Sequence, residues 1–303
     1  MLSRLVLLAF LAGCCFVLFG AENRVVEAGE RNTPRAVSGQ VDFSGLPFSA
    51  DAPAFSLDGE WEFYWQQLLS PMDFARGIQG APQIVKVPGP WNPYAPRTDN
   101  LAGFGYGTYR LTITVPKNIR SLALDFASPR TAHKLWVNGT LVSSDGVVSP
   151  SAEIGEARYY NKIIPVSAAN GTVELVLQVS NYLHYKGGLR RSILLGDYRA
   201  MERRYSQENV GRVFTFGAMA TVGFFYIMLF SIRRSEKAAL FFGLFVLVIS
   251  LREITLDSII LLQLIPDLPQ SVILRIEYLS MFGLAVYTWF VDALLPEYMP
   301  KKL

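Results

Sequence analysis

This chain contains an uncharged apolar run from Val213 to Ile232. A helix rises about 1.5 Å per residue, so a run of this length crosses the roughly 30 Å hydrocarbon core of a bilayer. Arg233, Arg234 and Lys237 follow at once. Because lysine and arginine concentrate on the cytoplasmic side of membranes, this end of the helix is predicted to be cytoplasmic.

Two further apolar segments follow, and Pro266 and Pro269 mark an external turn between them. The predicted membrane helices are residues 211–232, 238–262 and 273–295. Residues 296–303 form the predicted cytoplasmic end, which carries Lys301 and Lys302. The C-terminal third is therefore predicted to cross the membrane three times.

Four charged residues fall in the outer halves of these helices or close to them. An unpaired charge inside the bilayer costs at least about 2.5 kcal/mol, so pairing is expected. Arg252 and Glu277 are predicted at similar depth on antiparallel helices and would form one ion pair. Asp257 and Arg275 would form a second pair nearer the surface. The alternative is that all four side chains extend to the outer interface.

Residues 1–21 are predicted to be a signal segment, with Arg4 before the apolar run Leu5–Phe19. Cleavage near residue 20 or retention as an anchor is one interpretation. Lipidation of Cys14 is the other, because residues 11–14 resemble a lipobox. Both cysteines of the chain lie in this segment, so no disulfide framework is predicted outside it. Residues 22–40 are predicted to be a linker.

From residue 41 to about 200 the pattern changes to strands. Residues 108–115 alternate, with Tyr109, Leu111, Ile113 and Val115 on one face. Asn138-Gly139 predicts a tight hairpin turn, and Asn170-Gly171 looks like a second turn of this kind. Short strands without intervening helices predict an all-β jelly-roll or galactose-binding-like sandwich ahead of the α-helical membrane region.

Several motifs carry a resemblance to a known family. They are Leu57-Asp58-Gly59-Glu60-Trp61, Val87-Pro88-Gly89-Pro90-Trp91, Gly105-Tyr106-Gly107-Thr108-Tyr109, Leu135-Trp136-Val137-Asn138-Gly139, and Ser180-Asn181 followed by Gly187-Gly188-Leu189. In this order and before membrane helices, they resemble the N-terminal portion of bacterial seven-transmembrane receptors with diverse intracellular signalling modules. Two of the motifs also resemble the sugar-binding jelly roll of family 2 glycosidases. The resemblance implies an external domain that binds carbohydrates or other small ligands.

Aromatic and polar side chains in predicted loops are the candidates for ligand contact. Sugar-binding jelly rolls stack aromatic rings on sugar faces and pair planar polar side chains with hydroxyls. The candidates are Trp91, Tyr94, Tyr106, His184, Tyr185 and Arg190. The tryptophans and the phenylalanine in strand patterns are instead assigned to the core: Trp61, Phe63, Trp65 and Trp136.

The inventory of reactive groups gives no pattern for catalysis. The two histidines, His133 and His184, lie far apart and show no metal-ligand spacing, and no phosphate loop or nucleophile motif is present. We therefore expect no catalytic residue, metal or cofactor. A net charge of +3 is too small and scattered to indicate nucleic acid.

The sequence thus predicts a multi-pass receptor of the bacterial inner membrane, with the sandwich outside the cytoplasm. Its expected partners are the lipid bilayer and a small-molecule or carbohydrate ligand. The alternatives are a cell-envelope protein whose sandwich docks a partner and a membrane-tethered, glycan-acting enzyme. No signalling module follows the three predicted spans. Either the sequence belongs to a longer receptor, or a homo-oligomer or a separate signalling chain supplies the output.

Overall fold

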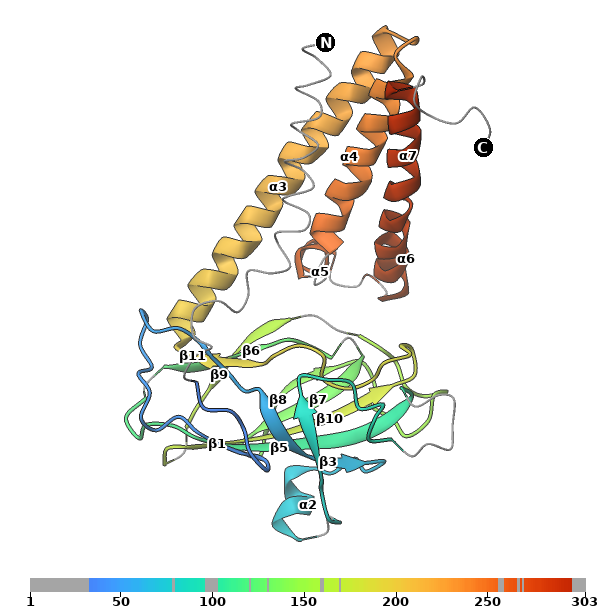
Figure 1. Ribbon diagram of the computed structural model, residues 1–303. Coiled ribbons are helices and arrows are strands. Elements are labelled where there is room, and N and C mark those ends of the chain that lie inside the picture. Colours follow the sequence, from blue (N-terminus) through green and yellow to red (C-terminus); the bar gives the residue numbers. More distant parts are fainter. Residues whose placement is uncertain are drawn as a thin grey trace.

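The computed structural model describes residues 33–77, 80–95, 103–119, 121–129, 131–158, 161–168, 170–255, 259–265, 268 and 270–295. A two-layer β-sandwich lies beneath a bundle of helices, and helix α3 (Tyr198–Ile232) joins the two parts (Figure 1). The predicted signal segment with Cys14 and the predicted cytoplasmic end at 296–303 lie outside the described residues.

The first layer is a seven-stranded sheet, here called sheet A. Its strands follow the order β4-β3-β5-β10-β7-β8, and β1 pairs in parallel with the end of β5. The strands are β1 (Gln40–Asp42), β3 (Gly59–Trp65), β4 (Gln83–Val87), β5 (Gly105–Thr114), β7 (Ala132–Val137), β8 (Thr140–Asp145) and β10 (Thr172–Asn181). All pairs except that of β1 are antiparallel.

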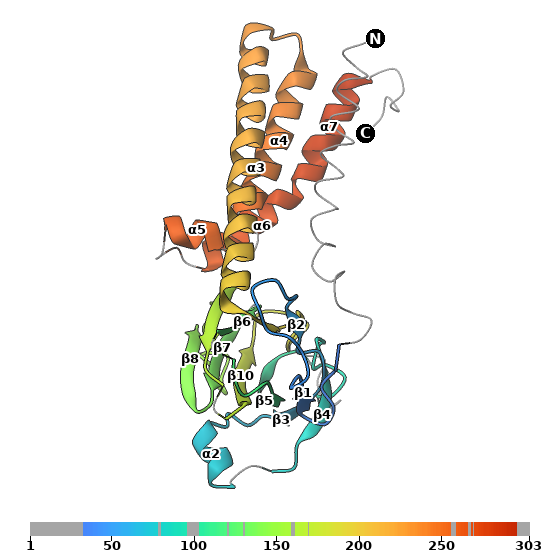
Figure 2. The same ribbon diagram turned by 90° about the vertical axis from the view of Figure 1, so that its left-hand side faces the viewer.

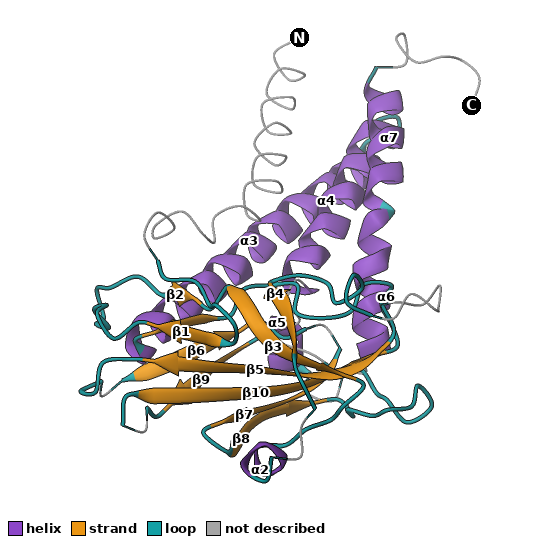
Figure 3. Cartoon of the chain, turned by 60° about the horizontal axis from the view of Figure 1, so that its bottom comes forward, coloured by secondary structure: helices purple, strands orange, loops and turns teal. Residues whose placement is uncertain are grey.

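The second layer, sheet B, has four antiparallel strands in the order β2-β11-β6-β9. They are β2 (Phe55–Ser56), β6 (Leu122–Phe126), β9 (Lys162–Val166) and β11 (Leu194–Gly196). Figure 1 shows sheet B on the side of the helical bundle and the short helix α2 (Pro71–Ala75) on the opposite side of the sandwich. Figure 3 brings the strands of sheet A forward, with α2 in front of them.

The predicted alternation of the long strands is confirmed. Leu111, Ile113, Leu175 and Leu177 are all 0% exposed, because one face of β5 and β10 packs against sheet B. This gives an antiparallel sandwich followed by apolar helices, as expected; the finer assignment to a jelly roll stays a prediction. Trp136 does not join the core as expected. It is half-buried and points away from the buried side chains that flank it on β7.

The two predicted Asn-Gly turns differ in what they connect. All four turn residues have positive φ, between 48° and 81°, which glycine and asparagine tolerate best. Asn138-Gly139 closes the β7–β8 hairpin of sheet A, as predicted. Asn170-Gly171 instead joins β9 of sheet B to β10 of sheet A, so it carries the chain between layers.

Part of the predicted linker packs on the sandwich. Ala36 is 2% exposed, its N–H donates to the Asp58 carbonyl at 2.9 Å, and its carbonyl accepts from the Glu60 N–H at 2.7 Å. Strand β1 begins at Gln40.

The first membrane helix is longer than predicted. Helix α3 runs unbroken for 35 residues from Tyr198, whereas the predicted span begins at residue 211. The other helices are α4 (Lys237–Thr255), α5 (Ile259–Leu264), α6 (Gln270–Met281) and α7 (Gly283–Leu294). Among the described residues, three helical stretches are long and apolar enough to cross a membrane: Tyr198–Ile232, Lys237–Thr255 and Ser271–Leu294.

Helices α3 and α4 pack closely side by side (Figure 2). A Cβ on Gly243 would lie 2.8 Å from the Gly223 carbonyl oxygen and 3.1 Å from the Ile227 nitrogen. Small residues therefore bring the two backbones together, as is common between membrane helices. Phe242 of α4 packs against Tyr226 of α3, with ring centroids 4.6 Å apart, and against Phe290 of α7, at 5.3 Å.

The two predicted ion pairs stay predictions. Arg252 is half-buried in α4, and Arg275 is exposed on α6. Asp257 and the side chain of Glu277 lie outside the described residues.

Candidate functional site

Three loops meet at the end of sheet A where β5 begins and β10 ends. We call residues 88–95, 103–106 and 181–190 together the loop platform. Its base is aromatic: Trp91 stacks on Phe63 with ring centroids 6.0 Å apart, and Trp65 meets Trp91 edge-on at 5.4 Å. Glycine on β5 makes room for these rings, because a Cβ on Gly107 would lie 2.6 Å from the Phe63 ring.

The side-chain amides of Asn181 and Asn92 join the three loops to one another. Asn181 is 0% exposed, and its Nδ2 donates to the carbonyls of Gly103 and His184, at 2.6 Å each. Asn92 Nδ2 donates to the Tyr185 carbonyl at 2.9 Å, and Asn92 Oδ1 accepts from the Gly187 N–H at 3.2 Å. Three of these four hydrogen bonds tie segments at least 78 residues apart in sequence, so the side-chain amides hold the loops together.

The predicted ligand contacts separate into buried and exposed groups. Trp91 is 1% exposed and its indole N–H donates to the Gly103 carbonyl at 3.1 Å, so this ring belongs to the core. Tyr185 is 74% exposed and Arg190 is also exposed. Tyr94, Tyr106 and His184 are half-buried. The structure thus places all six on one platform, with Tyr185 and Arg190 most accessible.

A fourth loop, residues 146–158, borders the platform. The Tyr182 hydroxyl donates to the Ser149 carbonyl at 3.2 Å, and the Ser149 N–H donates to Ser180 Oγ at 3.3 Å. Burial, and to a lesser degree the neighbouring Tyr106, raises the pKa of Tyr182. The sequence contains no signal for Asn92 or Tyr182, and it shows Asn181 only as part of a motif. The linking role of Asn181 could not be predicted, because one of its partners, Gly103, lies 78 residues away.

A cluster of charged and polar side chains lies between the sheets near this fourth loop. His133 and Asp145 are 0% and 6% exposed, and Lys162 Nζ lies 2.8 Å from Asp145 Oδ2. His133 Nε2 lies 3.0 Å from Ser143 Oγ. Burial, and secondarily the Lys162 charge, lowers the pKa of His133 to about 3, so this imidazole is neutral at neutral pH.

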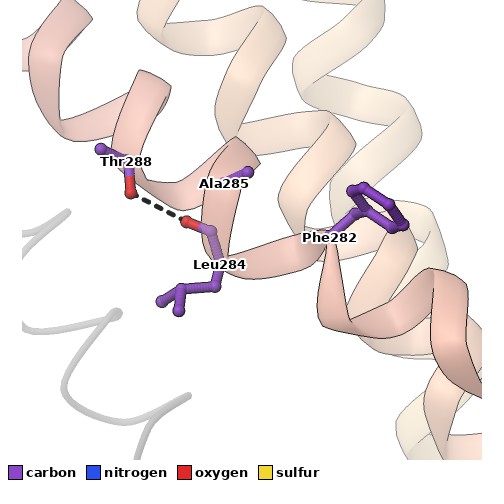
Figure 4. A pocket seen from close by; sticks show the side chains of 4 residues that line it. All are labelled: Phe282, Leu284, Ala285 and Thr288. Carbon is purple, nitrogen blue, oxygen red and sulfur yellow. Dashed lines mark hydrogen bonds between the residues drawn. The ribbon is translucent and has the colours of Figure 1, made fainter. Parts of the chain in front are cut away.

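No group of three or more histidine, cysteine or carboxylate side chains within the described segments is placed to hold a metal ion. An open depression at the junction of α6 and α7 is lined by Phe282, Leu284, Ala285 and Thr288 (Figure 4). The hydroxyl of Thr288 donates to the Leu284 carbonyl at 3.0 Å. The depression lies in a predicted membrane span and offers little polar recognition.

Residues 208–302 match the family described as 7TM diverse intracellular signalling. No curated protein matches the chain. Among solved structures, a β-glucuronidase from Ruminococcus gnavus is 17% identical, covers 50% of this chain and has a TM-score of 0.35. The same enzyme in complex with D-glucuronic acid is 18% identical, covers 50% of this chain and has a TM-score of 0.36.

This chain spans only 30–31% of the length of those enzyme chains. At such TM-scores the likeness carries no argument about function. The family match is different, because it covers the membrane helices. It agrees with the resemblance seen in the sequence: the C-terminal part of this chain matches a seven-transmembrane family with diverse intracellular signalling. The chain is therefore a multi-pass membrane protein of the receptor or sensor type.

Proposed function

We propose that the sandwich binds an external small ligand, with carbohydrate as the first class to test, and that α3 passes the effect of binding to the membrane helices. The single observation that carries this proposal is the continuity of α3. Asp197 caps its start by accepting from the Ala200 N–H at 3.0 Å, and no break separates that cap from Ile232. A stiff helix transmits displacement, whereas a flexible tether would not.

The base of α3 is also fixed to the sandwich. Met201 is 6% exposed and packs in a small cluster with Ala123 of β6 and Leu194 of β11. A change in sheet B would therefore reorient the helix. A ligand shifts such an equilibrium only if it binds the two states with different affinity.

The loop platform is the proposed ligand site. Its exposed aromatic and guanidinium groups, Tyr185 and Arg190, suit the apolar faces and hydroxyls of a sugar. The amides of Asn92 and Asn181 hold its loops in place. Such a site needs little reorganisation on binding, which favours affinity.

The proposed orientation puts the sandwich in the periplasm and the α3–α4 turn in the cytoplasm of a bacterial cell. Arg233, Arg234 and Lys237 at that turn support it, because positive charges favour the cytoplasmic side. Labelling Ser235→Cys with a membrane-impermeant maleimide tests it, with Cys14 and Cys15 replaced by serine. Protection in intact cells supports the orientation, and rapid labelling contradicts it.

The test of ligand binding is a thermal-shift screen of the purified full chain against glycans and small metabolites. We expect dose-dependent stabilisation by one ligand class. Tyr185→Ala and Arg190→Ala should abolish it, while the controls Met72→Ala and Arg76→Ala, which change exposed residues of or next to α2, should retain it. Stabilisation that survives both platform variants would place the site elsewhere.

A second function, docking of an envelope protein, is supported by one observation. Exposed apolar side chains lie at the tips of adjacent loops: Ile154 is 66%, Leu183 47% and Tyr185 74% exposed. Failure of every small compound to stabilise a folded chain would favour this second function.

A further inference from the structure

The cluster between the sheets joins the two layers of the sandwich by charge. We call Ser128, His133, Ser143, Asp145 and Lys162 the inter-sheet cluster. His133 and Asp145 belong to sheet A, and Lys162 begins β9 of sheet B. Lys162 Nζ reaches both carboxylate oxygens of Asp145, at 2.9 and 2.8 Å, and donates to Ser143 Oγ at 3.2 Å.

One end of this cluster adjoins the loops at the proposed ligand site. Asp145 is the last residue of β8, and the loop 146–158 follows it directly. That loop is tied to the platform through Ser149, which contacts both Ser180 and Tyr182. A displacement of the loop therefore pulls on the residue that holds Lys162.

The other end adjoins the base of α3. Asn161 immediately precedes Lys162, and its carbonyl accepts from the Tyr205 hydroxyl of α3 at 3.4 Å. The side-chain oxygen of Asn161 accepts from the Ser128 N–H at 3.2 Å. Asn161 therefore contacts both α3 and a member of the inter-sheet cluster. Ile163, the residue after Lys162, packs in the cluster that holds Met201.

We propose that the inter-sheet cluster is a positioning device that couples the loop platform to the base of α3. Separating Asp145 from Lys162 would leave a buried charge without its partner, which is strongly unfavourable. The loop 146–158 and strand β9 therefore move together, and β9 carries α3 with it. The contacts form a contiguous physical network of the kind that carries coupling between sites. The role of this coupling in signalling rests on the proposed function.

The test is hydrogen–deuterium exchange of the full chain in nanodiscs without ligand, so its outcome does not depend on whether a ligand is found. Asp145→Asn and Lys162→Met should each raise exchange at least about five-fold both in residues 146–158 and in residues 198–208. Lys162→Arg keeps the positive charge, so exchange in both segments should stay at the rates of the parent chain.

The matched control is Arg110→Met. Arg110 Nη2 lies 2.6 Å from Glu174 Oε1 on the outer face of sheet A, away from sheet B. This control should raise exchange near β5 and β10 and leave residues 198–208 unchanged. Should Lys162→Met fail to fold, the milder Asp145→Asn decides the question. Two results would overturn the proposal. One is that Asp145→Asn speeds exchange only in residues 146–158; the other is that Arg110→Met speeds exchange in residues 198–208 as much as the cluster variants do.

Discussion

The close approach of α3 and α4 allows a quantitative prediction for Gly243→Ala. A Cβ here would lie 2.8 Å from the Gly223 carbonyl oxygen, and ordinary contact begins at 3.4 Å, so the atoms must separate by 0.6 Å. Both this oxygen and the Ile227 nitrogen at 3.1 Å are backbone atoms, so a side-chain rotation cannot relieve the clash. Gaps of this size forfeit roughly a quarter of the contact energy of the atoms that separate.

The matched control is Gly217→Ala on α3, where a Cβ would meet nothing within 4 Å. Both substitutions bring the same helix-propensity gain of up to about 1 kcal/mol, so the difference between them isolates the packing cost. We expect Gly243→Ala to be less stable than Gly217→Ala by about 1–3 kcal/mol, the usual cost of overpacking.

The measurement is SDS-driven unfolding of the helical region in mixed micelles, followed by circular dichroism. Equal stability of the two variants would refute the packing of α3 on α4 at Gly223 and Gly243. A greater loss in Gly217→Ala would show that α3 presents its other face to α4.

Three further outcomes are expected. The pKa of His133 is about 3 in the folded chain and near 6.5 when unfolded. The unfolded chain therefore binds a proton that the folded chain does not as pH falls from about 6.5 towards 3, and stability should fall by up to about 1.4 kcal/mol per pH unit in that window. His133→Gln should make the free energy of unfolding, measured by urea melts, depend less steeply on pH in this window. Asn181→Ala removes four hydrogen bonds of a buried amide and should cost about 1–3 kcal/mol, seen as a lower melting temperature. Met201→Ala should cost about 2–4 kcal/mol and raise hydrogen exchange at the base of α3.

Local patterns predicted the strands well and the loops less well. The alternation of Tyr109, Leu111 and Ile113 reflects a two-residue period that any half-buried strand must have, so it could be read directly. Trp91 follows a turn-like Val-Pro-Gly-Pro segment and was expected at a ligand site. It is buried because residues 187–189 fold over it: its backbone N–H donates to the Gly187 carbonyl at 3.1 Å. Nothing near Trp91 in sequence signals that contact.

The start of α3 was predicted too late for a related reason. Hydropathy finds the apolar span but not the polar turns before it, where Arg199 and Arg203 are exposed. Asp197 caps the start of α3, and Met201 anchors its first turn by burial. Both roles depend on the packing of sheet B, which the local sequence does not show. The inter-sheet cluster was equally hidden, because His133, Asp145 and Lys162 come from three different strands.

The proposed function requires that ligand binding in the sandwich change the position of the far end of α3. The most direct test places spin labels at Arg76→Cys, next to α2, and at Ser235→Cys, after α3, with Cys14 and Cys15 replaced by serine. Double electron–electron resonance is then recorded on the full chain in nanodiscs, with and without the compound that gives the largest thermal shift. We expect a ligand-dependent change in the distance distribution that disappears when three glycines are inserted after Tyr205. A distance distribution that stays unchanged at saturating ligand would contradict the coupling of ligand binding to α3.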